Sequence, residues 1–254
     1  YRGEFKAGKR DGQGVLTYPD GSKYRGEFKA DKRDGQGVLT YPDGSIYSGE
    51  FKAGKRNGKG SLTYSDGSKY EGGWKNDKRD GSGTYSHPEG RKYEGEWKDG
   101  KRDGQGVYTY SNGSKYEGGW KSGEPHGDGI FISRDKKYVG EFKFGKRDGQ
   151  GILTYPDGSI YRGEFKAGKR NGQGSLIYPN GSKYEGEWKE DERYGRGTYP
   201  DGSKYKGGFK AGKKDGKGIL VYPDGSRYEG EFKADMRDGF GSYFHLDGRK
   251  YEGR

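Results

Sequence analysis

The sequence contains no cysteine among its 254 residues and only one methionine. Without cysteine the protein forms no disulfide, has no thiol nucleophile and offers no thiolate ligand to a metal, which suits a reducing compartment. Hydrophobic residues make up only 26% of the chain, whereas charged residues make up 35%. No apolar run approaches the length of a membrane-spanning helix, and no signal peptide is visible.

This composition, taken alone, is typical of a disordered chain. The aromatic residues argue against disorder, because they make up 15% of the chain and are regularly spaced. The motif Tyr-x-Gly recurs every 23 residues, with one step of 22 and one of 21. It begins at Tyr1, Tyr24, Tyr47, Tyr70, Tyr93, Tyr116, Tyr138, Tyr161, Tyr184, Tyr205, Tyr228 and Tyr251.

A fixed period of this length indicates a repeat array in which neighbouring units stabilise each other. We therefore interpret residues 1–254 as a single array of eleven full units and the start of a twelfth. The first residue is not methionine, and the chain begins and ends in phase with the repeat. We expect it to be part of a longer chain. A residue present in every unit belongs to the scaffold or to a multivalent surface.

The unit from Tyr24 to Ile46 predicts two short strands. Apolar and polar residues alternate from Tyr24 to Phe28 and again from Gly35 to Tyr41, which is the pattern of half-buried strands. Residues 29–34 are predicted as a polar loop, and Pro42-Asp43-Gly44-Ser45 as a tight turn. No segment has the pattern of a helix.

The predicted fold is all-β, an elongated, twisted, single-layer antiparallel meander of stacked β-hairpins. Alternation places the aromatic residues and three glycines of each unit on one face, where glycine leaves room for a neighbouring ring over the backbone. A lone sheet shields such a face only by twisting, so we expect an aromatic-lined groove. Each unit should advance by ~10 Å, and eleven units should span roughly 110 Å.

The aromatic residues of this groove are the first candidate site. One interpretation is that they pack within the groove, and the other is that they form a platform on which a ligand stacks. The candidates are Tyr24, Phe28, Tyr41, Trp74, Trp97, Trp120 and Trp188.

The second candidate site is a basic edge, because the net charge of +11 is concentrated in the loops that follow the first strand of each unit. Such an edge keeps the protein soluble, or it forms a multivalent surface for an acidic partner or an anionic lipid. Its residues are Lys9, Arg10, Lys32, Arg33, Lys55, Arg56, Lys78, Arg79, Lys101, Arg102, Lys146, Arg147, Lys169 and Arg170.

The repeated residues resemble the MORN repeat family (membrane occupation and recognition nexus). Its pattern is Tyr-x-Gly-x-Trp/Phe, Gly-Lys, His/Asp-Gly-x-Gly and Asp-Gly, and residues 93–115 closely match it. The resemblance covers the whole chain and implies a rod of stacked β-hairpins, with no particular reaction. Proteins with such repeats include cytoskeletal and ciliary scaffolds, membrane-tethering proteins and regulatory segments attached to lipid kinases or methyltransferases.

We therefore predict a non-catalytic structural or interaction scaffold without cofactor, metal site or small-molecule substrate. We expect a cytoplasmic protein at the cytoskeleton, at a cilium or at the periphery of a membrane. Protein partners and end-to-end self-association are expected, whereas no nucleic-acid-binding module is recognisable. One alternative is binding to anionic phospholipid through the basic edge. Another is an accessory array of an enzyme whose catalytic domain lies outside this chain.

Overall fold

The computed structural model describes residues 1–181 and 183–254 as two compact units, Tyr1–Gly127 and Asp128–Arg254. The secondary structure of these described residues is entirely β, without any helix, as predicted. None of them therefore forms an apolar helix long enough to cross a membrane.

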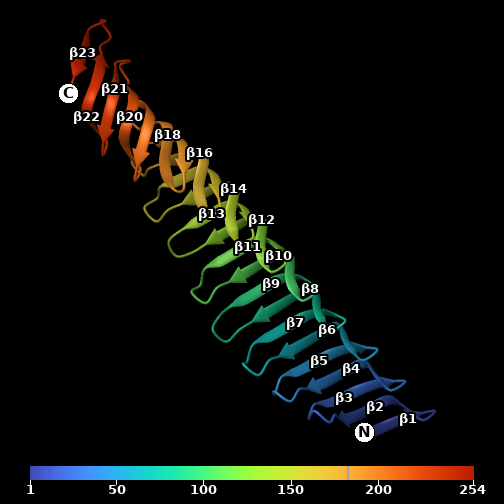
Figure 1. Ribbon diagram of the computed structural model, residues 1–254. Coiled ribbons are helices and arrows are strands. Elements are labelled where there is room, and N and C mark those ends of the chain that lie inside the picture. Colours follow the sequence, from blue (N-terminus) through green and yellow to red (C-terminus); the bar gives the residue numbers. More distant parts are fainter. Residues whose placement is uncertain (182) are drawn as a thin grey trace. The chain divides into compact units, whose positions relative to one another are not determined.

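In the unit Tyr1–Gly127, strands follow one another across the sheet in chain order (Figure 1). They are β1 (Arg2–Lys6), β2 (Lys9–Thr17), β3 (Lys23–Lys29), β4 (Lys32–Thr40), β5 (Ile46–Lys52), β6 (Lys55–Thr63), β7 (Lys69–Lys75), β8 (Lys78–Ser86), β9 (Lys92–Lys98), β10 (Lys101–Thr109) and β11 (Lys115–Lys121). The boundary between the two units falls within β12 (Glu124–Ile132).

The unit Asp128–Arg254 has the same arrangement of antiparallel neighbours. Its strands are β13 (Lys137–Lys143), β14 (Lys146–Thr154), β15 (Ile160–Lys166), β16 (Lys169–Ile177), β17 (Lys183–Lys189), β18 (Glu192–Thr198), β19 (Lys204–Lys210), β20 (Lys213–Val221), β21 (Arg227–Lys233), β22 (Met236–Phe244) and β23 (Lys250–Gly253). Each unit is thus a meander of hairpins.

The loop predicted for residues 29–34 is much shorter in the structure. Strand β4 already begins at Lys32, so Ala30 and Asp31 alone form the turn. Both have positive φ, 46° and 69°, as in a two-residue type I′ hairpin turn. This turn matches the twist of its strands, and it lets Lys29 pair directly with Lys32.

The tight turn predicted at Pro42-Asp43-Gly44-Ser45 is present in the structure. The backbone N–H of Gly44 donates to the carbonyl of Tyr41 over 3.1 Å, and that of Tyr41 donates to the carbonyl of Ser45 over 2.8 Å. Gly44 has φ of 87°, a conformation that glycine adopts without strain.

In each of the two compact units, the core is a row of aromatic rings that spans several repeats, with neighbouring rings packed edge to face. The Tyr24 ring lies 5.0 Å from Phe28 in its own repeat and 5.1 Å from Phe51 in the next, measured between centroids. The same arrangement recurs in both units, and each of the tyrosines that has it joins two repeats: Tyr47, Tyr70, Tyr93, Tyr138, Tyr161 and Tyr205. Edge-to-face pairs of this kind stabilise a fold beyond the area that they bury.

Glycine provides the room for these rings, as predicted from the alternation along the strands. A Cβ at Gly37 would overlap with the ring of Tyr24, and a Cβ at Gly26 would overlap with the backbone of Gly37. The hydroxyl of Tyr24 passes over this gap and donates to the carbonyl of Glu27 over 2.9 Å. A buried phenol thereby keeps a hydrogen bond in a sheet that is only one layer thick.

Candidate interaction surfaces

The structure buries nearly all of the aromatic candidates. Tyr24, Phe28 and the four tryptophans Trp74, Trp97, Trp120 and Trp188 are each at most 7% exposed. The indole N–H of Trp74 donates to the carbonyl of Gly60 over 3.1 Å, and the other three tryptophans have the equivalent bond. Tyr41 is partly exposed. These rings therefore pack with one another and with the backbone, and Tyr41 offers more surface than the rest.

The basic residues predicted for one edge divide into two groups with different surroundings. The lysines are exposed, whereas the arginines next to them are partly buried. The reason is that successive side chains of a strand point to opposite faces of the sheet. Because β4 begins at Lys32, Arg33 lies opposite Phe28 and shares the inner face of the sheet with Gly37 and Leu39. The lysine points to the opposite face.

The inward arginines connect successive repeats. The guanidinium of Arg56 lies 5.6 Å from the ring centroid of Tyr47 in its own repeat and 4.3 Å from that of Trp74 in the next. It also donates to the carboxylate of Asp77 over 3.2 Å and to the carbonyl of Asp77 over 2.9 Å. Cation–π contacts and charged hydrogen bonds thus bind each hairpin to its neighbour.

Most other predicted arginines repeat this contact. Arg10 and Arg170 donate to Asp31 and Asp191. A second set donates to a turn carbonyl of the following repeat, over 2.5 Å to 2.6 Å: Arg33 to Gly54, Arg102 to Gly123 and Arg147 to Gly168. Burial lowers the pKa of Arg102 from its usual value. These side chains are part of the fold.

Pairs of lysines flank the two-residue turns and make up the exposed part of the basic edge. In eight hairpins the two lysines face each other directly across the strands. The pairs are Lys6–Lys9, Lys29–Lys32, Lys52–Lys55, Lys75–Lys78, Lys98–Lys101, Lys143–Lys146, Lys166–Lys169 and Lys210–Lys213. In two other hairpins the second lysine of the pair is replaced, so that Lys189 faces Glu192 and Lys233 faces Met236. We call these eight pairs the lysine turns.

The turns at the other ends of the strands carry carboxylates. Asp20 accepts hydrogen bonds from the backbone N–H and the hydroxyl of Ser22, over 2.9 Å and 2.7 Å. These bonds lower the pKa of the Asp20 carboxyl, and the same holds for Asp66, Asp201 and Asp224. Throughout the described residues, no group of three His, Asp or Glu side chains could hold a metal ion.

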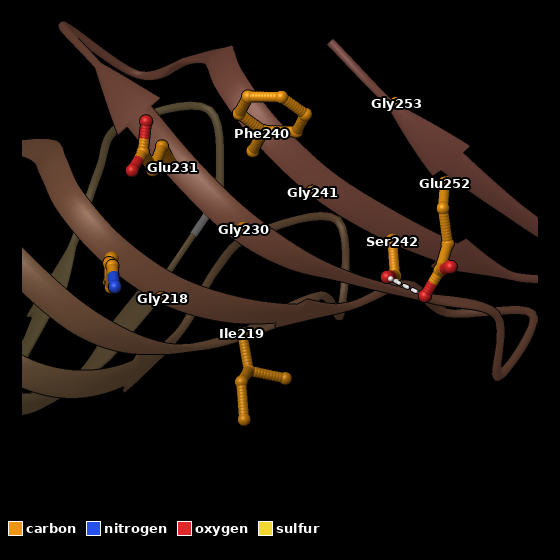
Figure 2. Close-up of a pocket in the computed structure, with 10 residues that line it drawn as sticks. Gly218, Ile219, Gly230, Glu231, Phe240, Gly241, Ser242, Glu252 and Gly253 are labelled. Atoms are coloured by element: carbon orange, nitrogen blue, oxygen red, sulfur yellow. Dashed lines mark hydrogen bonds between the residues drawn. The ribbon is translucent and has the colours of Figure 1, made fainter.

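A depression lies on the outer face near the end of the chain, over β20 to β23 (Figure 2). Glycines of these strands form its floor, and Ile219, Phe240 and Glu252 line it. Phe240 is 60% exposed, and the hydroxyl of Ser242 donates to the carboxylate of Glu252 over 3.0 Å. The depression is open to solvent.

The comparisons with known proteins identify the repeat. A family model described as "MORN repeat" matches residues 1–23, 24–46, 47–69, 70–90, 93–115, 116–136, 138–160, 161–183, 184–204, 205–227 and 228–248. No curated protein matches the sequence.

Similar solved structures include a TCP domain and a TCP10 domain. The TCP domain of Drosophila melanogaster SAS-4 (dCPAP), in complex with a proline-rich motif of Ana2 (dSTIL), is 18% identical. The match covers 70% of this chain and 90% of that chain, with a TM-score of 0.29. A mutant TCP10 domain of Danio rerio CPAP is 14% identical, with coverage of 94% and 98% and a TM-score of 0.28. TM-scores this low carry no information about the function of this chain.

Proposed function

Because the chain belongs to the MORN repeat family, we propose that it acts as a non-catalytic structural or interaction scaffold that holds protein partners at the cytoskeleton or a cilium. The observation that carries this proposal is that the residues that pack the repeats together differ from those that remain exposed. The aromatic rings, glycines and arginines are used to pack one hairpin on the next, whereas the lysine turns remain exposed.

The lysine turns suit multivalent binding. Strands are ~4.8 Å apart, so consecutive lysine turns within one unit are separated by roughly 10 Å. Single exposed charges contribute little to affinity in water, whereas several that engage one partner together raise it strongly. A partner with negative charges along an extended surface therefore fits this edge better than a small molecule does.

Detergent extraction of cells that express the chain tests the proposal. A cytoskeletal scaffold remains in the insoluble fraction after the membranes have been dissolved, and raised salt then releases it. Complete release by detergent alone would contradict cytoskeletal association.

A second candidate function is peripheral binding to anionic phospholipid, and the turn at Phe144 favours it. Phe144 is 61% exposed at the tip of the hairpin between Lys143 and Lys146. An apolar side chain between two cations suits the boundary between headgroups and acyl chains. In flotation assays with phosphatidylserine vesicles, Phe144→Ala should weaken binding. Alanine already occupies the equivalent position at Ala7, Ala30, Ala53 and Ala167, so this change is compatible with the turn. Equal flotation of both proteins would remove the support from Phe144.

A further inference from the structure

A second depression, with a volume of about 540 Å³, lies entirely within the unit Tyr1–Gly127. It extends from Tyr64 and Ser68, at the turn between β6 and β7, to Lys101 and Gly123, at the turns on the opposite edge. It therefore crosses the inner face of the sheet from one edge to the other. We call it the inner depression.

The inner depression coincides with a departure from the repeat. At the position where other repeats have Leu16, Leu39 and Leu62, the next two repeats have Tyr85 and Tyr108. Both tyrosines pair directly with Tyr93 on the strand between them. The same region contains three tryptophans in successive repeats, Trp74, Trp97 and Trp120. Two phenol groups are thus added to the inner face at this place.

Arg79, which also lines the inner depression, differs from the arginines of the neighbouring repeats. Its guanidinium lies 4.3 Å from the ring centroid of Trp97, 5.5 Å from Tyr70 and 5.7 Å from Tyr85. In residues 1–181 and 183–254, however, no acceptor for its side-chain N–H groups is found, whereas Arg33 and Arg102 each donate to a turn carbonyl. The rings fix this guanidinium in place and leave its donors available.

The charges around the inner depression favour an anion. The guanidinium groups of Arg79 and Arg102 lie over its rings, and Asp66 is the one carboxylate among the lining residues. Asp66 already accepts hydrogen bonds from the backbone N–H and the hydroxyl of Ser68, over 2.8 Å and 2.6 Å. Its other oxygen lies 3.8 Å from Nε2 of His87. Two guanidinium groups therefore face one carboxylate whose hydrogen bonds are satisfied within the protein.

We propose that the inner depression binds an acidic, extended peptide segment and that Arg79 receives one of its Asp or Glu carboxylates. A guanidinium donates two parallel hydrogen bonds to a carboxylate, and the aromatic walls supply apolar contact for the rest of the segment. A depression that crosses the face from turn to turn suits an extended chain. This inference rests on the scaffold function and names the chemistry of one partner.

The test is a titration of the whole chain with a hexaglutamate peptide, in which tryptophan fluorescence and calorimetry measure the binding. Arg79→Gln should weaken binding by about tenfold or more, because it removes a charged pair of hydrogen bonds. Arg79→Lys keeps the charge and loses the paired donors, so an intermediate loss is expected. Lysine is compatible with this position, since Lys214 occupies the equivalent place over Tyr199 and Phe232.

Two further variants separate binding from folding. Tyr85→Leu restores the residue that the preceding repeats have, so it should fold normally and still weaken peptide binding by a few-fold. Arg147→Gln is the matched control, because the Arg147 guanidinium already donates to Gly168 and lies in the unit Asp128–Arg254. It should leave hexaglutamate binding unchanged.

Absence of hexaglutamate binding, or binding that is the same in Arg79→Gln and Tyr85→Leu as in the unaltered chain, would overturn the proposal. Inorganic phosphate and phosphatidylserine vesicles form the second arm. If either binds with the same dependence on Arg79 and displaces the peptide, the inner depression is a phosphate or headgroup site and the peptide assignment is wrong. These results are independent of the detergent extraction that tests the scaffold function.

Discussion

The guanidinium of Arg56 lies 4.3 Å from the ring centroid of Trp74, which belongs to the next repeat of the chain. This contact shows that a residue within a basic stretch of sequence is part of the packing between repeats. The side chain of Arg56 is only 17% exposed, and Asp77 accepts its hydrogen bonds. The positive charge of the sequence is therefore larger than the charge that a partner meets at the edge.

Loss of the Arg56 contact should destabilise the unit Tyr1–Gly127. Arg56→Gln removes the guanidinium hydrogen bonds to Asp77 and the contact with Trp74, and we expect a loss of about 1–3 kcal/mol in the free energy of unfolding. Urea denaturation followed by circular dichroism measures it. Lys55→Gln, at the exposed neighbouring position, is the control and should change stability by no more than about 0.5 kcal/mol. Equal effects of both changes would refute the structural role of Arg56.

Gly37→Ala should destabilise the fold because of the space that the Tyr24 ring occupies. A Cβ at Gly37 would overlap with that ring, and overpacking of this kind typically costs about 1–3 kcal/mol. Val38→Ala, on the exposed face of the same strand, should have little effect. Thermal unfolding of the two variants makes the comparison, and an unchanged midpoint for Gly37→Ala would show that the ring can move aside.

The lysine turns should bind acidic surfaces in proportion to their number. Reversal of Lys55, Lys78 and Lys101 to glutamate, one after another, should weaken such binding in steps. Raised salt should have the same effect, because exposed charges are screened within about 8–10 Å at physiological ionic strength. If neither the charge reversals nor raised salt weakened the binding, these lysines would serve only to keep the protein soluble.

Strong alkali should unfold the protein. Burial raises the pKa of Tyr70, Tyr184 and Tyr205 to about 12, above that of an exposed tyrosine. The unfolded chain then loses these protons first, so stability is independent of these groups below pH of about 10 and falls as the pH rises further. Phenolate absorbance and circular dichroism should change together. A gradual rise in phenolate absorbance without loss of β structure would contradict the burial of these rings.

Much of the fold was predictable, because alternation along a strand is a local property. Tyr24, Phe28 and Leu39 could be assigned to one face from their spacing, and the need for glycine opposite a ring followed from that. The place of Arg33 was not predicted, because residues 29–34 were interpreted as a loop. Its contact with the ring of Phe51, 5.0 Å away, depends on the register of two hairpins.

The signal for this arginine was nevertheless present in the sequence. If the second strand is extended back to Lys32, Arg33 falls in phase with Gly35, Gly37 and Leu39 on the inner face. Ala30-Asp31 alone gave a weak indication of a type I′ turn, since Asn-Gly and Asp-Gly are its usual residues. Arg79 differs from Arg33 and Arg102 in that its guanidinium donates to no turn carbonyl among the described residues. This difference could not be predicted, because it depends on how far each guanidinium lies from the carbonyl of the next turn.

We propose that the arginines hold the repeats together and that the lysine turns bind the partner. Retention on detergent-extracted cytoskeletons, measured together with melting temperature for two variants of the chain, tests this division most directly. The first variant changes Lys32, Lys55, Lys78 and Lys101 to glutamine, and it should melt as the unaltered chain does and be lost from the pellet. The second, Arg56→Lys, should melt at a lower temperature and remain in the pellet. Retention of the glutamine variant at the level of the unaltered chain would contradict the account.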